Sequence, residues 1–267
     1  MEFVDTHTHR NDEKFLAGGT SEIEGALQRA AKADVTRLIN MGDTLESSEK
    51  AVQLAERYAS CGVYAGVGIH PEEARPLSET DDDILAGWTD MPHVVCIGEI
   101  GLDYHWEKDM SRRKLQQDVF IRQLDLARQL HMPVCIHSRD AHADTLRILQ
   151  HEGQGLRGVL HCYSGSVEMA LELCRRGWYI GVDGPVTFKN AKRNVRVVQA
   201  VPLEQLLLET DAPYMAPEPV RGTRNEPANI PYIARKVAAI KDIEVEEVAR
   251  VTTANAMNLY DLDRHQV

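Results

Sequence analysis

The chain has 267 residues, which is close to the size of one α/β barrel. Its hydrophobic fraction of 43% is ordinary for a globular protein, and no apolar stretch reaches the roughly 20 residues of a membrane span. The net charge of −11, from 30 Lys and Arg against 41 Asp and Glu, argues against a protein that coats nucleic acid. It does not exclude a phosphate-bearing substrate, because divalent cations bound in a site would invert the local field.

The N-terminus and the cysteines predict the compartment. The first residues, MEFVDTHTHR, contain no basic segment followed by an apolar one, so they do not resemble a signal peptide. The 5 cysteines are scattered without a CxxC spacing, which is typical of buried thiols in a reducing compartment. We therefore expect a cytoplasmic protein with no membrane association. The sequence leaves the oligomeric state open, and a monomer is compatible with it.

Short apolar runs alternate with longer amphipathic stretches along the whole chain. Eight of these runs are predicted strands: Glu2–Asp5, Val35–Met41, Val63–Ile69, Val94–Ile100, Val134–His137, Val159–His161, Trp178–Val182 and Leu206–Glu209. The stretches between them have helical spacing, as in SRRKLQQDVFIRQLDLARQL, and Gly and Pro mark the joins. Eight strand–helix repeats in this length favour an α/β fold with a closed (β/α)8 TIM barrel over an open doubly wound sheet.

Both ends of the chain agree with a barrel. The first strand is followed by DTHTHR, which has no GxGxxG phosphate loop, so a dinucleotide-binding fold is not favoured. No linker or low-complexity segment interrupts the alternation, and we expect one domain over residues 1–267. The segment VEEVARVTTANAMNLYDL, after Asp242, is predicted to be a C-terminal helix that closes against the barrel.

Residues that can bind a metal or transfer a proton lie at the ends of six predicted strands. They are His7, His9, His70, Glu99, His137, His161 and Asp211. Active sites of such barrels are built from the C-terminal ends of several strands. A chance scatter would not gather these residue types at that one edge.

The first strand ends in the HxH pattern of His7 and His9. Residues two apart in an extended chain point the same way, so the two histidines can share one metal. Taken alone, the pattern fits two ordinary loop histidines equally well. Asp5 has the same parity, and it either orients a ligand or caps the following turn.

Glu99 lies inside the apolar strand VVCIGEIGLDY. A buried carboxylate must be protonated, paired or metal-bound, because an unpaired buried charge is costly. Placed between two cations, Glu99 could bridge them. Asp103, two residues after Gly101, is expected to serve the loop instead of a metal.

His137 in VCIHSRD and His161 in GVLHCYSG each end a strand-like run, and Asp211 in LLLETDAPYMAP follows the last one. A lone histidine in such a place is more often structural, but two at equivalent ends of adjacent strands favour metal ligation. In a closed barrel the eighth strand neighbours the first. Asp211 can therefore meet His7 and His9 on one metal, or accept a proton from a metal-activated water.

Seven motifs together resemble the TatD-type deoxyribonucleases, a branch of the amidohydrolase-like metal barrels. They are DTHTH, GIHP, GEIGLDY, HSRD, HCYSG, ETDAPYMAP and RGTRNEP, in order from Asp5 to Pro227. The segments GEIGLDYHW and GPVTFKNAK look closest to the bacterial YcfH/YabD-like subgroup. Thr8 stands where the family often has Cys, and Arg10 replaces a common Leu and could alter the mouth of the site.

The resemblance implies a metal-dependent phosphodiesterase or nuclease with two divalent cations, whether Zn²⁺, Mn²⁺, Mg²⁺ or Ni²⁺. By this resemblance His7, His9, Glu99 and Asp211 would hold one metal. Glu99, His137 and His161 would hold the second, so that Glu99 is shared. His70 and Arg221 would lie beside the substrate phosphate.

The expected reaction is metal-assisted hydrolysis of a phosphodiester, with DNA or a related molecule as the substrate. Glu99, Asp211 and His70 are the candidate catalytic residues, and Asp211 would orient or deprotonate the water. The guanidinium of Arg221 could hold a phosphate oxygen, and its alternative is a solvated loop charge.

Two other functions stay open from the sequence. The same ligands would suit an amidase, lactonase or deacylase that acts on a small carbonyl compound. A non-enzymatic protein that keeps its metals structurally is the other alternative, although structural zinc sites are usually closed and four-coordinate. The native metal, the choice between DNA and RNA and the exo- or endonuclease mode are not encoded in these patterns.

Overall fold

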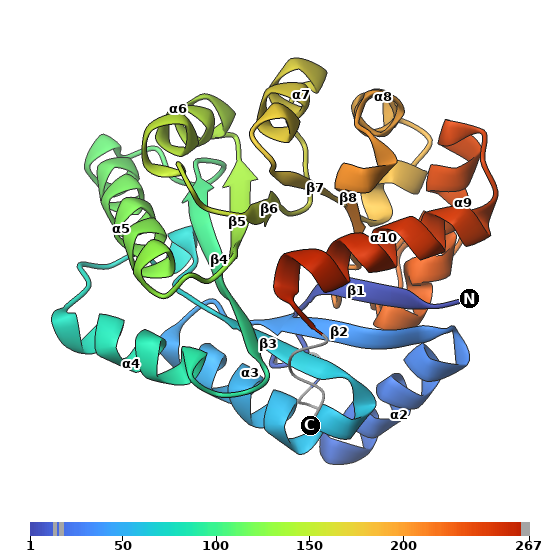
Figure 1. The fold of residues 1–267 in the computed structure, drawn as a ribbon, viewed down its shortest axis with the longest axis horizontal. Helices are drawn as coiled ribbons and strands as arrows, with labels where there is room; N and C mark the ends of the chain where they lie inside the picture. The colour runs from blue at the N-terminus through green and yellow to red at the C-terminus, as the bar shows by residue number, and fades with distance from the viewer. Residues whose placement is uncertain (13–14, 16–18, 263–267) are drawn as a thin grey trace.

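Eight parallel strands form a barrel in a computed structural model that describes residues 1–12, 15 and 19–262 (Figure 1). They are β1 (Phe3–Thr8), β2 (Val35–Met41), β3 (Val63–Val67), β4 (Val94–Asp103), β5 (Val134–Arg139), β6 (Gly158–Leu160), β7 (Tyr179–Val182) and β8 (Leu206–Leu208). Each strand pairs with the next one in the chain. The predicted (β/α)8 barrel is confirmed.

The barrel closes between the first and the last strand through a single bridge. Thr8 and Ala212 pair in parallel, just beyond the end of β8. The Asp211 N–H donates to the His7 carbonyl at 2.9 Å, and the His9 N–H donates to the Ala212 carbonyl at 2.7 Å. Closure therefore brings Asp211 beside the two histidines of the first strand.

Helices follow the strands and cover the outside of the barrel (Figure 1). They are α2 (Gly19–Lys32), α3 (Leu45–Arg57), α4 (Glu79–Thr89), α5 (Met110–Gln129), α6 (His142–Glu152), α7 (Val167–Arg175), α8 (Lys192–Ala200), α9 (Ile230–Lys241) and α10 (Val245–Tyr260). Local sequence fixes several starts: Thr44 and Ser78 each form a capping box, before α3 and α4. The main apolar core lies between these helices and the outer faces of the strands.

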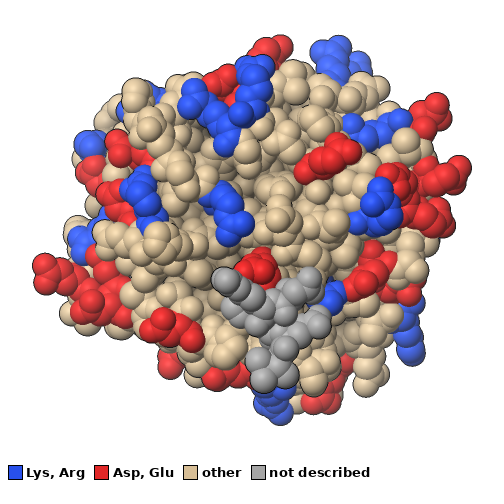
Figure 2. Space-filling view, viewed as in Figure 1, with Lys and Arg blue, Asp and Glu red and all other residues tan. Residues whose placement is uncertain are grey.

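The C-terminal helix α10 packs against β1 and β8, as predicted for a closing helix. Its last turn buries Leu259 and Tyr260 in a second apolar cluster with side chains of the strands, among them Val4, Ile39 and Leu207. On the face that carries α10, acidic and basic side chains are interspersed (Figure 2).

Three strands extend further than their apolar runs predict. The predicted ends of β1 at Asp5, of β4 at Ile100 and of β5 at His137 are wrong, because the strands continue to Thr8, Asp103 and Arg139. Backbone pairing with the neighbouring strands carries each of them through its polar residues. Glu99 consequently lies inside β4 and not at its end.

Within the described ranges, no helix has the length and apolar composition needed to cross a lipid bilayer. All 5 cysteines are free thiols.

Candidate metal centre

The seven polar residues at the strand ends converge at one rim of the barrel. His7 and His9 come from β1 and the residue after it, Glu99 from β4 and His137 from β5. His70, His161 and Asp211 lie in the connections that follow β3, β6 and β8. All seven side chains contact at least one other member of the set.

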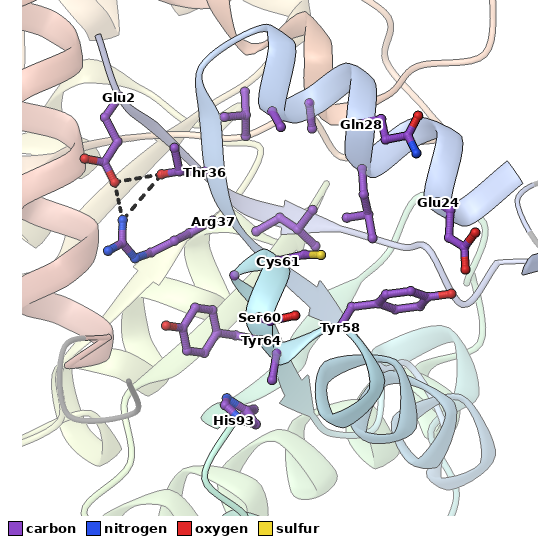
Figure 3. A pocket seen from close by; sticks show the side chains of 17 residues that line it. Glu2, Glu24, Gln28, Thr36, Arg37, Tyr58, Ser60, Cys61, Tyr64 and His93 are labelled. Atoms are coloured by element: carbon purple, nitrogen blue, oxygen red, sulfur yellow. Dashed lines mark hydrogen bonds and ion pairs between the residues drawn. The ribbon is translucent and has the colours of Figure 1, made fainter. Parts of the chain in front are cut away.

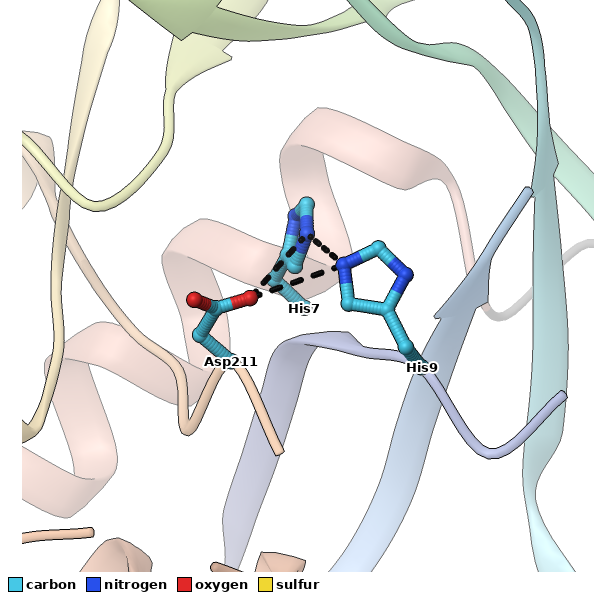
Figure 4. Close-up of side chains that lie close together, drawn as sticks. All are labelled: His7, His9 and Asp211. Atoms are coloured by element: carbon cyan, nitrogen blue, oxygen red, sulfur yellow. Dashed lines mark hydrogen bonds and ion pairs between the residues drawn. The ribbon is translucent and has the colours of Figure 1, made fainter. Parts of the chain in front are cut away.

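The first group of donors consists of His7, His9 and Asp211 (Figure 4). The Nε2 atoms of the two histidines are 3.0 Å apart, and Asp211 Oδ1 lies 3.8 Å from His7 Nε2 and 3.5 Å from His9 Nε2. Glu99 Oε2 faces the same group, at 3.2 Å from His7 Nε2 and 3.4 Å from His9 Nε2. Two ligands about 2.1 Å from one ion lie roughly 3.0–4.2 Å apart, depending on the angle between them, so this spacing suits one shared cation.

The second group surrounds the other oxygen of Glu99. Its Oε1 atom lies 2.6 Å from His161 Nε2, 2.8 Å from His137 Nδ1 and 3.6 Å from His70 Nε2. His137 Nδ1 and His161 Nε2 are 3.3 Å apart. Glu99 therefore faces a separate set of imidazole nitrogens with each of its oxygens.

Burial and charge prepare these groups for cations. The pKa of His7 is lowered to about 4 by its burial and by repulsion from His161, so its ring is neutral at pH 7. Burial works to raise the pKa of Glu99, but the nearby His161 and His7 hold it well below its usual value. A neutral His7 ring beside the ionised Glu99 is the protonation state that a divalent metal needs. At His9 and His137, hydrogen bonds to carboxylates outweigh burial and raise the pKa, so a cation bound there would displace a proton from each ring. The donor set fits divalent cations.

The centre lies in a cleft of about 620 Å³ that is lined mostly by polar side chains. Seven lining residues are acidic: Asp12, Asp43, Glu72, Glu99, Asp103, Asp183 and Asp211. Among the lining residues, all from the described part of the chain, Arg139 is the only Lys or Arg. A polyanion would thus be repelled from this cleft unless cations neutralise it.

A larger pocket, of about 930 Å³, lies away from the centre between α2, β2 and the turn Ala59–Cys61 (Figure 3). The groups with metal-ligand spacing in the described ranges contain none of its lining residues. The candidate site is therefore assigned to the smaller cleft on the chemistry of its side chains and not on its volume.

Comparison with known proteins agrees with the geometry of the centre. The family model for TatD related DNase matches residues 4–261. The chain belongs to the TatD family. This membership confirms the resemblance drawn from the seven motifs.

Several TatD relatives match over nearly the whole chain. A metal-dependent hydrolase named YabD, from Bacillus subtilis, is 38% identical over 97% of this chain and 99% of its own length. The 3'-5' ssDNA/RNA exonuclease TatD of Citrobacter koseri is 35% identical over 90% of this chain and 93% of its own. The crystal structure of YJJV, a TatD homologue from Escherichia coli K12, superposes with a TM-score of 0.87 at 31% identity, covering 97% of this chain and 98% of that one.

Two carboxylates that the sequence did not assign to the centre lie beside its histidines, and one of them, Asp103, forms a hydrogen bond. Asp103 Oδ2 lies 2.9 Å from His137 Nε2, and with Glu99 this hydrogen bond outweighs burial and raises the pKa of His137 to about 9. Glu209 is fully buried, and its Oε1 lies 3.8 Å from His161 Nδ1. Residue spacing in the sequence could have indicated both carboxylates, because alternate residues of a strand point the same way. Asp103 shares the strand face of Glu99, and Glu209 is two residues from Asp211.

Asp5 supports the backbone near the centre and does not reach the ligands with its side chain. Its carboxylate accepts hydrogen bonds from Thr210 N at 2.9 Å and Thr210 Oγ1 at 2.5 Å, and a longer one from His7 N at 3.4 Å. Burial raises the pKa of Asp5 to about 7. It ties β1 to the segment after β8 and so helps to place both His7 and Asp211.

Two arginines, Arg221 and Arg10, are not among the residues that line the cleft. Arg221 stacks over Phe188, with Cζ 4.1 Å from the ring centroid, and it is not among the residues that line the cleft. Its role beside the phosphate stays a prediction. The expectation that Arg10 alters the mouth of the site is wrong, because Arg10 is buried and donates to the Ile23 carbonyl of α2 at 3.0 Å.

Proposed function

We propose that this TatD protein hydrolyses phosphodiester bonds in nucleic acid, with DNA as the expected substrate, at a site that holds two divalent cations. The observation that carries the proposal is the position of Glu99, whose two oxygens face two separate groups of histidines. In this proposal residues 1–267 act as one barrel domain, and the compartment is the cytoplasm. The relative from Citrobacter koseri named as an ssDNA/RNA exonuclease supports the choice of substrate.

The ligands divide between the two cations at Glu99. His7, His9 and Asp211 would hold the first ion with Glu99 Oε2, and His137 and His161 would hold the second with Glu99 Oε1. His70 Nε2, 3.6 Å from Glu99 Oε1, lies at the edge of the second group, where it can contact the substrate. Bound cations would supply charge neutralisation for the phosphate and lower the pKa of a water molecule.

Asp211 is the residue best placed to handle the proton of that water. A hydrogen bond with His9 and the charges of the neighbouring histidines offset burial and lower the pKa of Asp211, so it is ionised and can accept a proton. Its Oδ1 atom faces the histidines of the first group, and its side chain is partly exposed to the cleft.

The first test is the removal of metal. We expect a chelator to abolish hydrolysis of labelled single-stranded and duplex DNA, and Mn²⁺, Mg²⁺, Zn²⁺ or Ni²⁺ to restore it, because mixed histidine and carboxylate sites discriminate poorly among these ions. Product analysis on gels would distinguish exonuclease from endonuclease cleavage. Undiminished activity in excess chelator, after elemental analysis has confirmed metal loss, would contradict the proposal.

The second test compares two arginines. Arg139 lines the cleft and is 44% exposed, whereas Arg221 is 54% exposed and lies outside the lining. A hydrogen bond from a charged donor to a phosphate contributes about 1.5–3 kcal/mol, so Arg139→Gln should raise KM for DNA by roughly 10- to 100-fold. Arg221→Gln is the matched variant, and the sequence-based role of Arg221 would require a similar increase in KM.

Between the two open alternatives, the comparisons favour an enzyme. YabD is named a hydrolase and the Citrobacter koseri relative an exonuclease, which argues against a purely structural metal site. An amidase or lactonase has no specific observation in its favour, whereas Arg139 beside the centre suits a phosphate.

A further inference from the structure

An exposed tryptophan stands at the wall of the metal cleft. Trp106 lies between β4 and α5, lines the cleft and is 73% exposed. Large hydrophobic residues exposed in the described part of the chain are few, and three of them line this cleft: Trp106, Tyr214 and Met215. The indole of Trp106 is the most exposed of the three.

The loop that carries Trp106 is held in place by polar contacts. His105 packs edge-on against the indole, with centroids 4.4 Å apart, and its Nδ1 lies 2.8 Å from Asp140 Oδ2. Lys108 Nζ donates to the carbonyls of Tyr104 and His105, at 3.3 and 2.8 Å. The indole is therefore presented to the cleft on a fixed backbone, which lowers the entropy lost when a ligand contacts it.

Trp106 also lies next to Arg139, the only Lys or Arg among the described residues that line the cleft. The guanidinium carbon of Arg139 is 6.0 Å from the centroid of the indole, and Arg139 Nη1 is 4.0 Å from Asp103 Oδ2. Asp103 in turn contacts His137 of the metal centre. A nucleotide whose phosphate is held between the centre and Arg139 would have its base within reach of the indole.

The opposite wall carries a second ring. Tyr214 follows β8, which lies across the barrel from β4, and its hydroxyl donates to Asp12 Oδ2 at 2.6 Å. Its ring is edge-on to His9, with centroids 6.4 Å apart. Tyr214 is thus turned toward the first group of ligands, and Trp106 offers the more exposed face for stacking.

We propose that Trp106 binds substrate by stacking on a base of the strand whose phosphate is held at the metal centre. The inference rests on the proposed function. It adds a contact with the base, whereas the proposed metal ligands and Arg139 would contact only the phosphate. Stacking suits this cleft because the acidic lining repels a polyanion, and a π-face attracts any base without using charge.

The test uses two oligonucleotides with identical backbones. One is a short single-stranded oligothymidylate, and the other is an oligomer of the same length made of abasic tetrahydrofuran nucleotides. kcat/KM is measured on both with saturating metal, for the wild type and for Trp106→Ala, Trp106→Phe and Met110→Ala. Met110 is 71% exposed and lies outside the lining of the cleft, so Met110→Ala is the matched surface control.

We expect Trp106→Ala to lower kcat/KM on oligothymidylate by about 5- to 150-fold, mainly through KM, and to leave the abasic oligomer unaffected. Trp106→Phe should recover much of the loss, and Met110→Ala should change neither substrate. An equal loss on both oligomers, or no loss on either, would overturn the inference while leaving the nuclease function intact. If the wild type cleaves neither oligomer, the proposed function fails, and the inference fails with it.

Discussion

Glu99→Gln should abolish hydrolysis and release metal from both groups of ligands. The carboxylate faces His7 and His9 with one oxygen and His137 and His161 with the other, so its charge would be shared by the two proposed cations. Losing a residue that merely orients a ligand costs about 10- to 100-fold in metal affinity or activity, and the loss of the bridging charge should exceed that range. Elemental analysis of the purified variant, beside kcat/KM at saturating metal, measures both effects.

The matched control for this variant is Glu72→Gln. Glu72 is a second carboxylate in the lining of the cleft, and it is not one of the centre's ligands. Its amide variant should keep metal and most activity. A Glu99→Gln protein that retains two equivalents of metal with near-normal kcat would refute the bridging role. Thermal unfolding of both variants shows whether either substitution disturbs the fold.

Asp211→Asn should lower kcat without the loss of metal that is expected for Glu99→Gln. It leaves Glu99 and the histidines in place, so much of the metal should remain while the proton acceptor is lost. General-base contributions are about 10²–10⁴-fold, so kcat should fall by at least that range with KM less affected. Metal content and kcat, measured on the same preparation, separate loss of chemistry from loss of metal.

Asparagine also suits the backbone conformation at position 211. The backbone of Asp211 has φ of +54°, a left-handed conformation that asparagine adopts more readily than other side chains. The hydrogen bond from its N–H to the His7 carbonyl should therefore persist. If Asp211→Asn keeps a near-normal kcat, Asp211 only positions metal, and the proton leaves by another route, with His70 as the next candidate.

The sequence predicted the existence of every strand because each has a compact apolar run bounded by Gly, Pro or polar residues. It placed β2 over the observed residues, Val35–Met41, where the run and the pairing coincide. It ended β4 too early, since Gly101 interrupts the apolar run before Leu102 and Asp103. Only pairing with β5 keeps that backbone extended to Asp103.

The gathering of the proposed ligands was predictable because strand ends share one rim and alternate residues share one face. Arg221 shows where this logic ends. It lies in the long connection between β8 and α9, whose path no periodicity encodes, and the structure turns it toward Phe188. Arg139 sits two residues after His137 at the end of β5, and its parity with that ligand was the signal that it would face the cleft.

The residues of the two ligand groups are synthesised in a fixed order relative to the segment after β8, which closes the barrel against β1. Glu99, His137 and His161 all precede residue 162, so every residue of the second group is synthesised before the last strand. The first group is different, because His7 and His9 are among the earliest residues synthesised and Asp211 follows β8. The same segment carries the bridge between Thr8 and Ala212. Completion of the proposed metal centre and closure of the barrel thus depend on the same segment, and a chain that ends before Asp211 lacks both.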